Sequence, residues 1–375
     1  MNNAGKIIPI SDYIQCIKCL VDNIAHPEIQ IDQSGVCDIC YIVEKKLMRI
    51  ENLRKNNYLE KTLKKIKQRG KRKGYNCIVG ISGGMDSSYL SVKTKEWGLT
   101  PLLVHVDTGW NSEIAVTNIE TILNKLNLQL YTKVIPWEET KDLVNAFLKA
   151  SVVDIDWANE MAAQASLYSI AKKFNQKYIL TGHQISTEGW MPHTVVHYKL
   201  DLINFKAIHK LFGKLKLKSY PTIGFFNSYY YDKILGIKFI NPLDYIEYNK
   251  QEIKNLLIRD YNWREYGHKH YENVFTRFYQ GYILPRKFNI DKRKFHLSAL
   301  ILSGQITKAE ALNIISLDSY NDKPLLEMDK TFVLKKLGLN EEEFEKIMKT
   351  PVKNHTDYPS VFNIIKKIKN VWSNN

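Results

Sequence analysis

The sequence predicts an α/β protein: a doubly wound parallel sheet, preceded by a zinc-binding module and followed by a mainly helical C-terminal region. Three observations support this fold class. Short apolar runs alternate with helical stretches between residues 76 and 182, which is the order that builds a parallel sheet covered by helices. Four of the five cysteines form two close pairs near the N-terminus. From residue 246 onward we expect mainly helices.

Length and composition set outer limits. At 375 residues and 44% hydrophobic composition, the chain can bury a sizeable core divided into two or three units. It contains no apolar run of about eighteen residues, so no membrane span is expected. The first residues lack the pattern of a secretory signal. We therefore expect a cytoplasmic protein, in which paired cysteines are more often metal ligands than disulfides.

The N-terminal cysteines are spaced as metal ligands. Cys16 and Cys19 form one C-x2-C pair, and Cys37 and Cys40 form the second. Two residues between cysteines let both thiolates of a tight turn face one ion, and two such turns complete a tetrahedron. Because all four positions are sulfur, no place is left for water. The pattern predicts structural Zn²⁺; an iron–sulfur cluster and reduced surface thiols are the alternatives.

The positive charge is concentrated in the next segment. Of the formal charge of +15, residues 45–73 contribute 13 Lys or Arg against two Glu. Leucines and isoleucines recur there at helical spacing, which predicts an amphipathic helix with a cationic face. Two interpretations stay open: a solvated linker, or a surface that contacts phosphates of a nucleotide or of RNA.

Residues 76–81 predict a buried strand, and a glycine turn and a helix ending near Gly98 follow it. The first amides of a helix are unpaired and its dipole favours anions, while glycines allow close approach to the backbone. Serine hydroxyls add donors. The turn lacks the Gly-Lys-Ser/Thr of a Walker A loop and the three glycines of a dinucleotide fingerprint. It therefore predicts a phosphate site of another kind.

Ser-Gly-Gly-x-Asp-Ser after a buried strand resembles the PP-loop of the ATP pyrophosphatases. The resemblance implies a PP-loop (HUP-like) sheet that cleaves ATP between the α- and β-phosphates. It also implies phosphate-holding roles for Ser82, Gly83, Gly84, Asp86 and Ser87.

Further strands and helices continue the alternation. The expected elements are strands in 99–110, 128–135 and 177–182, and helices in 111–127, 137–149 and 159–176, the first of them capped by Asn111 or Ser112. Ligands of such sheets bind at the carboxyl ends of the strands. The polar residues at those ends are His105, Asp107, Thr181, Gly182 and His183. A structural hydrogen-bonding role for either histidine stays open.

Several motifs in order are similar to one family, the N-acetyl-sugar amidotransferases of bacterial surface-sugar pathways. They are "HVDTGWNSEIAVTNIE", "YILTGHQISTEGWMP", "FKAIHKLFG", the stretch from "GHKHYENVFTRFYQ" to "GQITKAEAL", and the cysteine pairs. The resemblance runs from about residue 16 to about residue 315. Members act on pseudaminic or legionaminic acid derivatives for flagellin glycosylation, or on sugars of the lipopolysaccharide O-antigen. The last sixty or so residues are interpreted only as a helical tail.

The resemblance implies a reaction in which an acetamido group becomes an acetamidino group. AMP is transferred from ATP to the carbonyl oxygen, ammonia attacks the carbon, and AMP departs. Mg²⁺ would neutralise the phosphate charge. The implied catalytic residues are Asp86, Asp107, His183 and Glu188, with His105, Thr181 and Gly182 beside the nucleotide. Asp86 and Asp107 are the candidates for the metal, although Asp86 could instead stabilise its helix N-terminus.

Two polar clusters are candidates for the sugar substrate and its charged groups. They contain Lys269, His270, Glu272, Thr276 and Arg277 in the first cluster, and Lys292, Arg293 and His296 in the second. Each residue taken singly is more often a solvated surface group.

The domain division follows from these assignments. It is 1–44 for the zinc module, 45–74 for the basic connecting helix, 75–245 for the PP-loop domain, and 246–375 for the helical region that contributes to the substrate site.

No cysteine is placed to serve a glutaminase. We therefore expect ammonia from a separate glutaminase subunit, with or without a partner that guides it, or from solution. Two rivals remain: a PP-loop enzyme that thiolates tRNA, which the basic helix would suit, and a non-catalytic zinc-ribbon interaction protein. Thiolation usually needs active-site cysteines, so nucleic acid is not the expected partner.

Overall fold

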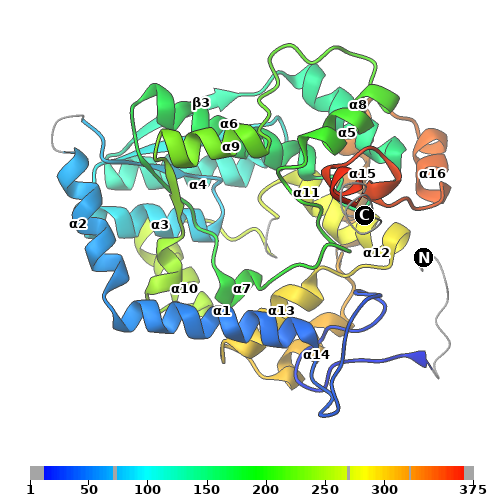
Figure 1. The fold of residues 1–375 in the computed structure, drawn as a ribbon, viewed down its shortest axis with the longest axis horizontal. Helices are drawn as coiled ribbons and strands as arrows, with labels where there is room; N and C mark the ends of the chain where they lie inside the picture. Colours follow the sequence, from blue (N-terminus) through cyan, green and yellow to red (C-terminus); the bar gives the residue numbers. More distant parts are fainter. Residues whose placement is uncertain (1–11, 71–73, 268–270, 321, 367–375) are drawn as a thin grey trace, which may run out of the picture.

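A parallel sheet of five strands forms the centre of the molecule (Figure 1). The structure is a computed structural model and describes residues 12–70, 74–267, 271–320 and 322–366. The strands lie in the order β3-β2-β1-β4-β5, and every neighbouring pair is parallel. Their bounds are Cys77–Gly80 for β1, Pro101–Asp107 for β2, Gln129–Val134 for β3, Tyr178–Leu180 for β4 and Lys238–Ile240 for β5. The predicted doubly wound parallel sheet is confirmed.

The strand order reverses beside β1. The chain adds β2 and β3 on one side of β1, then returns to add β4 and β5 on the other side. In open sheets of this kind the crevice at the carboxyl ends of the strands, where the order reverses, is the usual ligand site. The β5 strand was not predicted from the sequence.

Helices cover both faces of the sheet, as the alternation of side chains along β1 requires. Ile78 belongs to one core cluster with residues of α5 and α6, whereas Val79 belongs to a second cluster with residues of α3 and α4. The bounds are Met85–Glu96 for α3, Glu113–Leu126 for α4, Trp137–Ala150 for α5 and Trp157–Lys173 for α6. Ser112, not Asn111, caps α4 by accepting a 3.2 Å hydrogen bond from the Ala115 amide.

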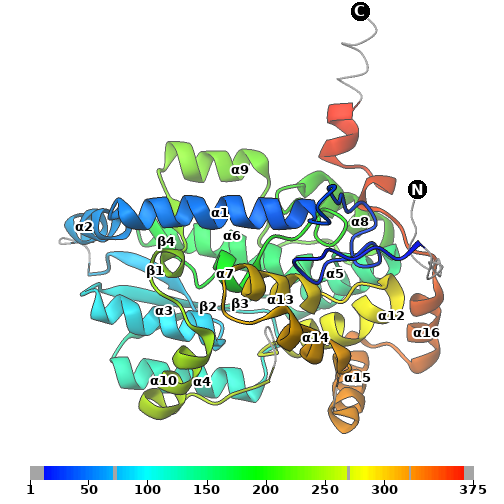
Figure 2. The same ribbon diagram turned by 90° about the horizontal axis from the view of Figure 1, so that it is seen from below.

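The predicted basic helix is in fact two helices (Figures 1 and 2). Helix α1 spans Asp38–Lys55 and α2 spans Tyr58–Gly70. Asn57 separates them with a left-handed φ of 53°, a conformation that asparagine tolerates better than most residues. Helix α1 begins at Asp38 and therefore carries Cys40. It continues without a break across the predicted boundary between the zinc module and the basic helix, at residues 44 and 45. The second cysteine pair is therefore built on the start of this helix.

The rest of the chain is mainly helical. The remaining helices are α7 (Ile185–Glu188), α8 (Leu202–Phe212), α9 (Phe225–Tyr229), α10 (Lys250–Tyr261), α11 (Val274–Phe278), α12 (Leu284–Phe288), α13 (Arg293–Leu302), α14 (Lys308–Ser316), α15 (Lys323–Leu337) and α16 (Glu341–Lys349), with short turns of 3-10 or π geometry at Tyr230–Ile234, Pro242–Tyr245, Tyr279–Ile283 and His355–Asp357. Within the described ranges no helix is long and apolar enough to cross a bilayer.

The C-terminal helices are not a loose tail. Val333, Leu334 and Leu337 of α15 are buried in the same core cluster as α5 and α11. On α16, Phe344 is buried there as well. Helix α15 also supplies Asp329, which forms two 2.6 Å hydrogen bonds with Arg277 of α11. These contacts hold α11 against the carboxyl edge of the sheet.

Candidate active site

The loop after β1 has the shape that its glycines predict. Gly83 has a φ of +80°, and a Cβ at this position would lie 2.3 Å from the Ala115 carbonyl oxygen. Only glycine fits both the left-handed conformation and this approach to α4. The Ser87 hydroxyl accepts from the Ser82 amide at 3.2 Å and donates to the Gly84 carbonyl at 3.1 Å. The serines thus close the turn from Ser82 to Ser87, called the loop wall below.

The end of β4 contacts this turn directly. A Cβ on Gly182 would lie 2.8 Å from the Asp86 carbonyl carbon and 2.9 Å from the Ser87 amide nitrogen. The glycine of "TGH" is therefore required by the close packing of two strand ends. The juxtaposition of these two motifs, predicted from parallel-sheet logic, is present in the structure.

A cavity of about 400 Å³ opens between the loop wall and the C-terminal helices. It lies at the carboxyl ends of β1, β2 and β4. The predicted residues among its lining are Ser82, Gly84, Asp86, Ser87, His105, Gly182, His183, Glu188, Glu272, Thr276 and Lys292. The predicted residues that are described but do not line it are Gly83, Asp107, Thr181, Arg277, Arg293 and His296. Lys269 and His270 lie outside the described residues.

Asp86 lies in the first turn of α3. Its Oδ1 accepts a 3.3 Å hydrogen bond from Gln184 Nε2 and another from the Tyr248 hydroxyl. Burial, reinforced by the Asp86 carboxylate, raises the pKa of Tyr248, so this phenol stays a donor. These two donors hold the Asp86 side chain at the N-terminus of α3.

His183 and Glu188 form a pair at the opening of the cavity. The His183 Nδ1 is hydrogen-bonded to a Glu188 carboxylate oxygen, across the single turn of α7. A carboxylate on one ring nitrogen fixes the orientation and the tautomer of an imidazole, so the other nitrogen is the one that can accept. The pair therefore has the arrangement of a proton acceptor.

His105 and Asp107 belong to a hydrogen-bonded loop. His105 Nδ1 lies 3.0 Å from the Ile81 carbonyl, which can only accept, so the proton is assigned to Nδ1. Its Nε2 then accepts from Asn111 Nδ2 at 3.0 Å. Asp107 Oδ1 accepts from Asn111 Nδ2 at 3.0 Å and from the Gly109 amide at 2.8 Å. The Asp107 carboxylate thus holds the loop after β2, and the structure does not place it in the cavity.

The C-terminal region supplies one side of the cavity. The Ser82 hydroxyl donates to Glu272 Oε1 at 3.3 Å, which ties this region to the loop wall. Asn273 caps α11 by accepting from the Thr276 amide at 2.9 Å, and Thr276 lines the cavity from this first turn. Lys292 lines it from the residue before α13.

Three predicted polar residues have other partners. Arg277 forms its buried pair with Asp329, Arg293 pairs with Asp291 at 2.7 Å, and the Thr181 hydroxyl donates to Asn241 at 2.6 Å. Each of these contacts positions an element around the cavity. The structure does not bring these three side chains into the cavity itself.

Sequence reasoning missed the start of α6. Asp156 and Asn159 are buried and line the cavity. Asp156 accepts 2.8 Å hydrogen bonds from Asn159 Nδ2 and from the Thr276 hydroxyl. Burial raises the pKa of Asp156. The sequence "DIDWANE" contains an ordinary helix-start signal, and nothing in it indicates that the acid faces a ligand.

The four N-terminal cysteines converge. The Sγ atoms of Cys16 and Cys40 are 3.7 Å apart, and those of Cys37 are 3.6 Å from both Cys19 and Cys40. Tetrahedral zinc with Zn–S bonds of about 2.3 Å requires sulfur atoms about 3.8 Å apart. All four cysteines are buried and none is in a disulfide. The residues therefore fit a structural zinc ion.

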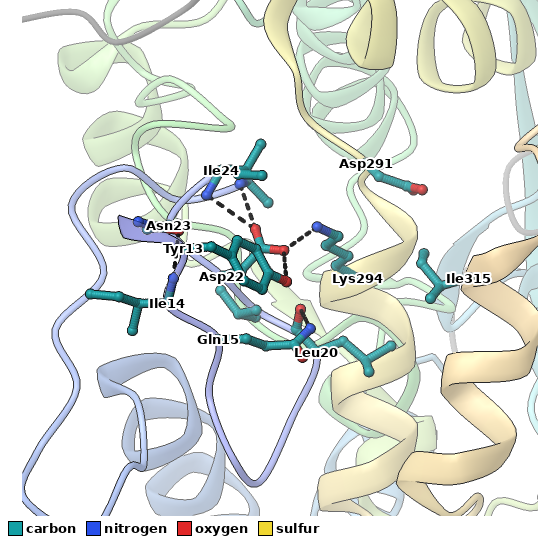
Figure 3. Close-up of polar contacts among 12 residues, drawn as sticks. Tyr13, Ile14, Gln15, Leu20, Asp22, Asn23, Ile24, Asp291, Lys294 and Ile315 are labelled. Carbon is teal, nitrogen blue, oxygen red and sulfur yellow. Dashed lines mark hydrogen bonds and ion pairs between the residues drawn. The ribbon is translucent and has the colours of Figure 1, made fainter. Parts of the chain in front are cut away.

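The zinc module is anchored on α13 and α14. The Leu20 amide donates to the Ser298 hydroxyl at 3.1 Å, and Lys308 Nζ donates to the Cys16 carbonyl at 2.8 Å. Figure 3 shows the fully buried Asp22 bonded to Tyr13, to the Ile24 amide and to Lys294 of α13. Because Lys292 lies just before α13, this anchor supports one side of the cavity.

Comparison with known proteins gives one family match. Residues 272–369 match the family described as "LPS biosynthesis protein WbpG-like, C-terminal domain". No curated protein matches the chain.

Similar solved structures share little identity with this chain. They include an NMN synthetase from Francisella tularensis (13% identity, TM-score 0.32) and an NH3-dependent NAD synthetase from Campylobacter jejuni (15%, 0.29), each over 76% of this chain and 96% of the other. A predicted tRNA methyltransferase subunit from Methanocaldococcus jannaschii covers 49% of this chain and 75% of its own (11%, 0.29). At these TM-scores the likeness carries no functional argument.

Proposed function

We propose that this protein is an ATP-dependent amidotransferase that converts an acetamido group of a bacterial surface sugar to an acetamidino group. One observation carries the proposal. The segment that begins the surface-sugar family match, at Glu272, Thr276 and Gln280, lines the same cavity as the Ser-Gly-Gly-x-Asp-Ser loop. A phosphate site and a sugar-pathway region therefore share one site.

In this proposal the loop wall holds the phosphates of ATP. Ser82 and Ser87 would supply hydroxyls, the missing side chain of Gly84 lets an oxygen approach the turn, as Glu272 Oε1 does in the structure, and the start of α3 supplies a positive dipole. Asp86 is the carboxylate that we propose would hold Mg²⁺. We do not assign Asp107 to the metal, because its oxygen already organises the loop after β2.

The reaction needs two steps. An amide carbonyl is a poor electrophile with a poor leaving group, so the sugar amide oxygen first takes AMP from ATP and pyrophosphate is released. Ammonia then forms a bond to the activated carbon, and the C–O bond breaks as AMP departs. We assign His183, oriented by Glu188, as the group that accepts protons from nitrogen during these steps.

Ammonia is proposed to come from a separate glutaminase subunit, guided by a partner, or from solution. Of the five cysteines, four form the zinc cluster and Cys77 is buried within β1. Burial raises the pKa of the Cys77 thiol, which makes it a poor nucleophile. Release of glutamate from glutamine by the purified chain would contradict this assignment.

The alternative, thiolation of tRNA, lacks support in the cavity. Sulfur delivery usually requires a cysteine beside the activated carbon, and no cysteine is among the described residues that line the cavity.

The test is product formation. The full chain is incubated with ATP, Mg²⁺, isotopically labelled ammonium and a panel of nucleotide-activated diacetamido sugars or nonulosonic acids. AMP, pyrophosphate and an amidine containing the label are expected with one class of sugar only. The double variant Ser82→Ala, Asp86→Asn should lose AMP formation. Thr181→Ser is the matched control, because its hydroxyl faces Asn241 outside the cavity. AMP formation with tRNA alone would overturn the proposal.

A further inference from the structure

Part of the cavity has no role in the steps above. Asp156 and Asn159 on α6, with Thr276 of α11, form what is called the acceptor wall below. Asn159 is only 7% exposed, yet its Oδ1 has no hydrogen-bond partner among the described residues. A buried amide oxygen without a partner loses its hydrogen bonds to water and gains none in return. In a wall that faces a cavity, this oxygen indicates a donor supplied by a ligand.

The orientation of the Asn159 amide is determined by its neighbour. Its Nδ2 donates to Asp156 Oδ1 at 2.8 Å. When Asp156 is ionised, exchanging the nitrogen and oxygen would set two acceptors against each other, so the oxygen is the unpartnered atom. The acceptor wall therefore presents an amide oxygen beside a carboxylate.

Asp156 keeps capacity for a cationic ligand. Its two hydrogen bonds use one acceptor position on each oxygen, and a carboxylate offers about four. It forms no ion pair in the part of the chain that the structure describes. The neighbouring acids differ, since Asp154 and Glu160 both pair with Lys199, at 2.6 and 2.7 Å. Lys292, which lines the same cavity, acts on Asp156 through its charge but forms no ion pair with it, so the buried carboxylate still suits a positively charged hydrogen-bond donor.

The proposed reaction creates such a group. The sugar amide is neutral; adenylylation of its oxygen releases the N–H proton to His183 and leaves a neutral imidate. Ammonia adds its electron pair to the carbon, and AMP leaves with the electrons of the C–O bond. The remaining N–C–N unit carries one positive charge and only N–H donors. The charge is absent from the substrate and develops as AMP departs, so a carboxylate at this point favours the transition state over the substrate.

We propose that Asp156 and Asn159 form a subsite that binds the amidinium formed in the reaction, Asp156 by its charge and Asn159 by its Oδ1. This inference rests on the proposed function. It assigns the acceptor wall to the new carbon–nitrogen group and the loop wall to the phosphates. Thr276 acts as a positioning residue, because its hydroxyl holds the second Asp156 oxygen.

The experiment uses acetamidinium and acetamide as probes of equal shape and different charge. Binding to the full chain is measured by ligand-observed NMR in the presence of ATP and Mg²⁺. We expect acetamidinium to bind at least tenfold more tightly than acetamide. Asp156→Asn should abolish this preference, and Asn159→Leu should reduce it several-fold. Glu160→Gln is the matched control: this carboxylate lines the same cavity but is already paired with Lys199, so the preference should remain.

The inference is overturned by equal binding of both probes, or by a preference that survives Asp156→Asn in a variant that still binds ATP. Ammonium that displaces acetamidinium at equal concentration would also overturn it, since the subsite would then belong to the incoming nitrogen. Failure of the proposed function looks different. Asp156-dependent binding of acetamidinium, with no AMP formed from any sugar, would support the subsite and contradict the sugar reaction.

Discussion

The two walls of the cavity are built in opposite ways. The loop wall is a single turn between β1 and α3, closed by its own serines. The acceptor wall joins Asp156 and Asn159 to Thr276, which lies 120 residues after Asp156 in the chain. The first wall depends on local backbone geometry, and the second depends on how α6 and α11 pack. Changes to the loop should therefore act on nucleotide binding, and changes to the helix packing should act on the other substrate.

Loss of zinc should have the largest effect on local stability, and that effect should differ between the two walls of the cavity. Cys40→Ser is expected to lose the metal and release the anchor on α13 and α14, because structural zinc supplies much of the folding free energy of such modules. Hydrogen exchange should rise at least tenfold in α13 and α14, and less in β1 and α3.

Cys77→Ala removes the one thiol outside the cluster and should retain the zinc, as measured by metal analysis. Equal loosening of both walls in Cys40→Ser would contradict the division between them.

Asp329→Asn should destabilise the protein by about 3–5 kcal/mol, since it leaves the buried Arg277 guanidinium without its charge partner. Urea unfolding measures the free energy. Helix α11 carries Thr276, so acetamidinium binding should fall more than ATP binding. The exposed pair of Arg259 and Asp260 provides the control, and Asp260→Asn should leave stability unchanged. Similar losses in both variants would show that the α11–α15 contact is unimportant.

Gly83→Ala should act on the loop wall. The substitution combines a left-handed φ with a contact to the Ala115 carbonyl, at a cost of about 2–4 kcal/mol. ATP binding, measured by calorimetry, should be lost while acetamidinium binding remains. Gly304→Ala has a similar φ of +73° but nothing within 4 Å, so it isolates the conformational cost of about 1 kcal/mol. If Gly83→Ala matched this control, the close approach to α4 would be irrelevant.

Asp107→Asn should have the smallest effect. An asparagine oxygen can still accept from the Gly109 amide and from Asn111, so stability should change by about 1 kcal/mol or less. AMP formation at saturating Mg²⁺ should persist at a similar rate. If Asp107→Asn lost as much AMP formation as Asp86→Asn, Asp107 would be a metal ligand after all. The loop after β2 would then belong to the loop wall.

Contiguous features could be predicted from the sequence. The four cysteines, the strand before Ser82 and the capped helix at Ser112 each depend on spacing, apolar pattern or capping within a few residues. The parallel sheet then brings the ends of β1 and β4 together, so the contact of Gly182 with the loop wall followed from the order of elements.

Neighbouring residues in the C-terminal clusters could not be separated in this way. Thr276 lines the cavity while Arg277 turns to Asp329, and Lys292 lines it while Arg293 turns to Asp291. Successive residues of a helix point about 100° apart. Side chains that are adjacent in the sequence therefore face different parts of the structure. Asp156 and Asn159 were not predicted as site residues. Thr276, which bonds to Asp156, lies on a helix distant in the sequence, so no local pattern marks these two residues.

The sequence by itself determined the four clustered cysteines, the order of strands and helices through β4, and the glycine turn after β1, because each is encoded by local geometry and periodicity. Only the tertiary structure decided which polar side chains share the cavity and which hold helices together. That choice depends on the rotation and packing of helices far apart in the chain, and no local pattern records it.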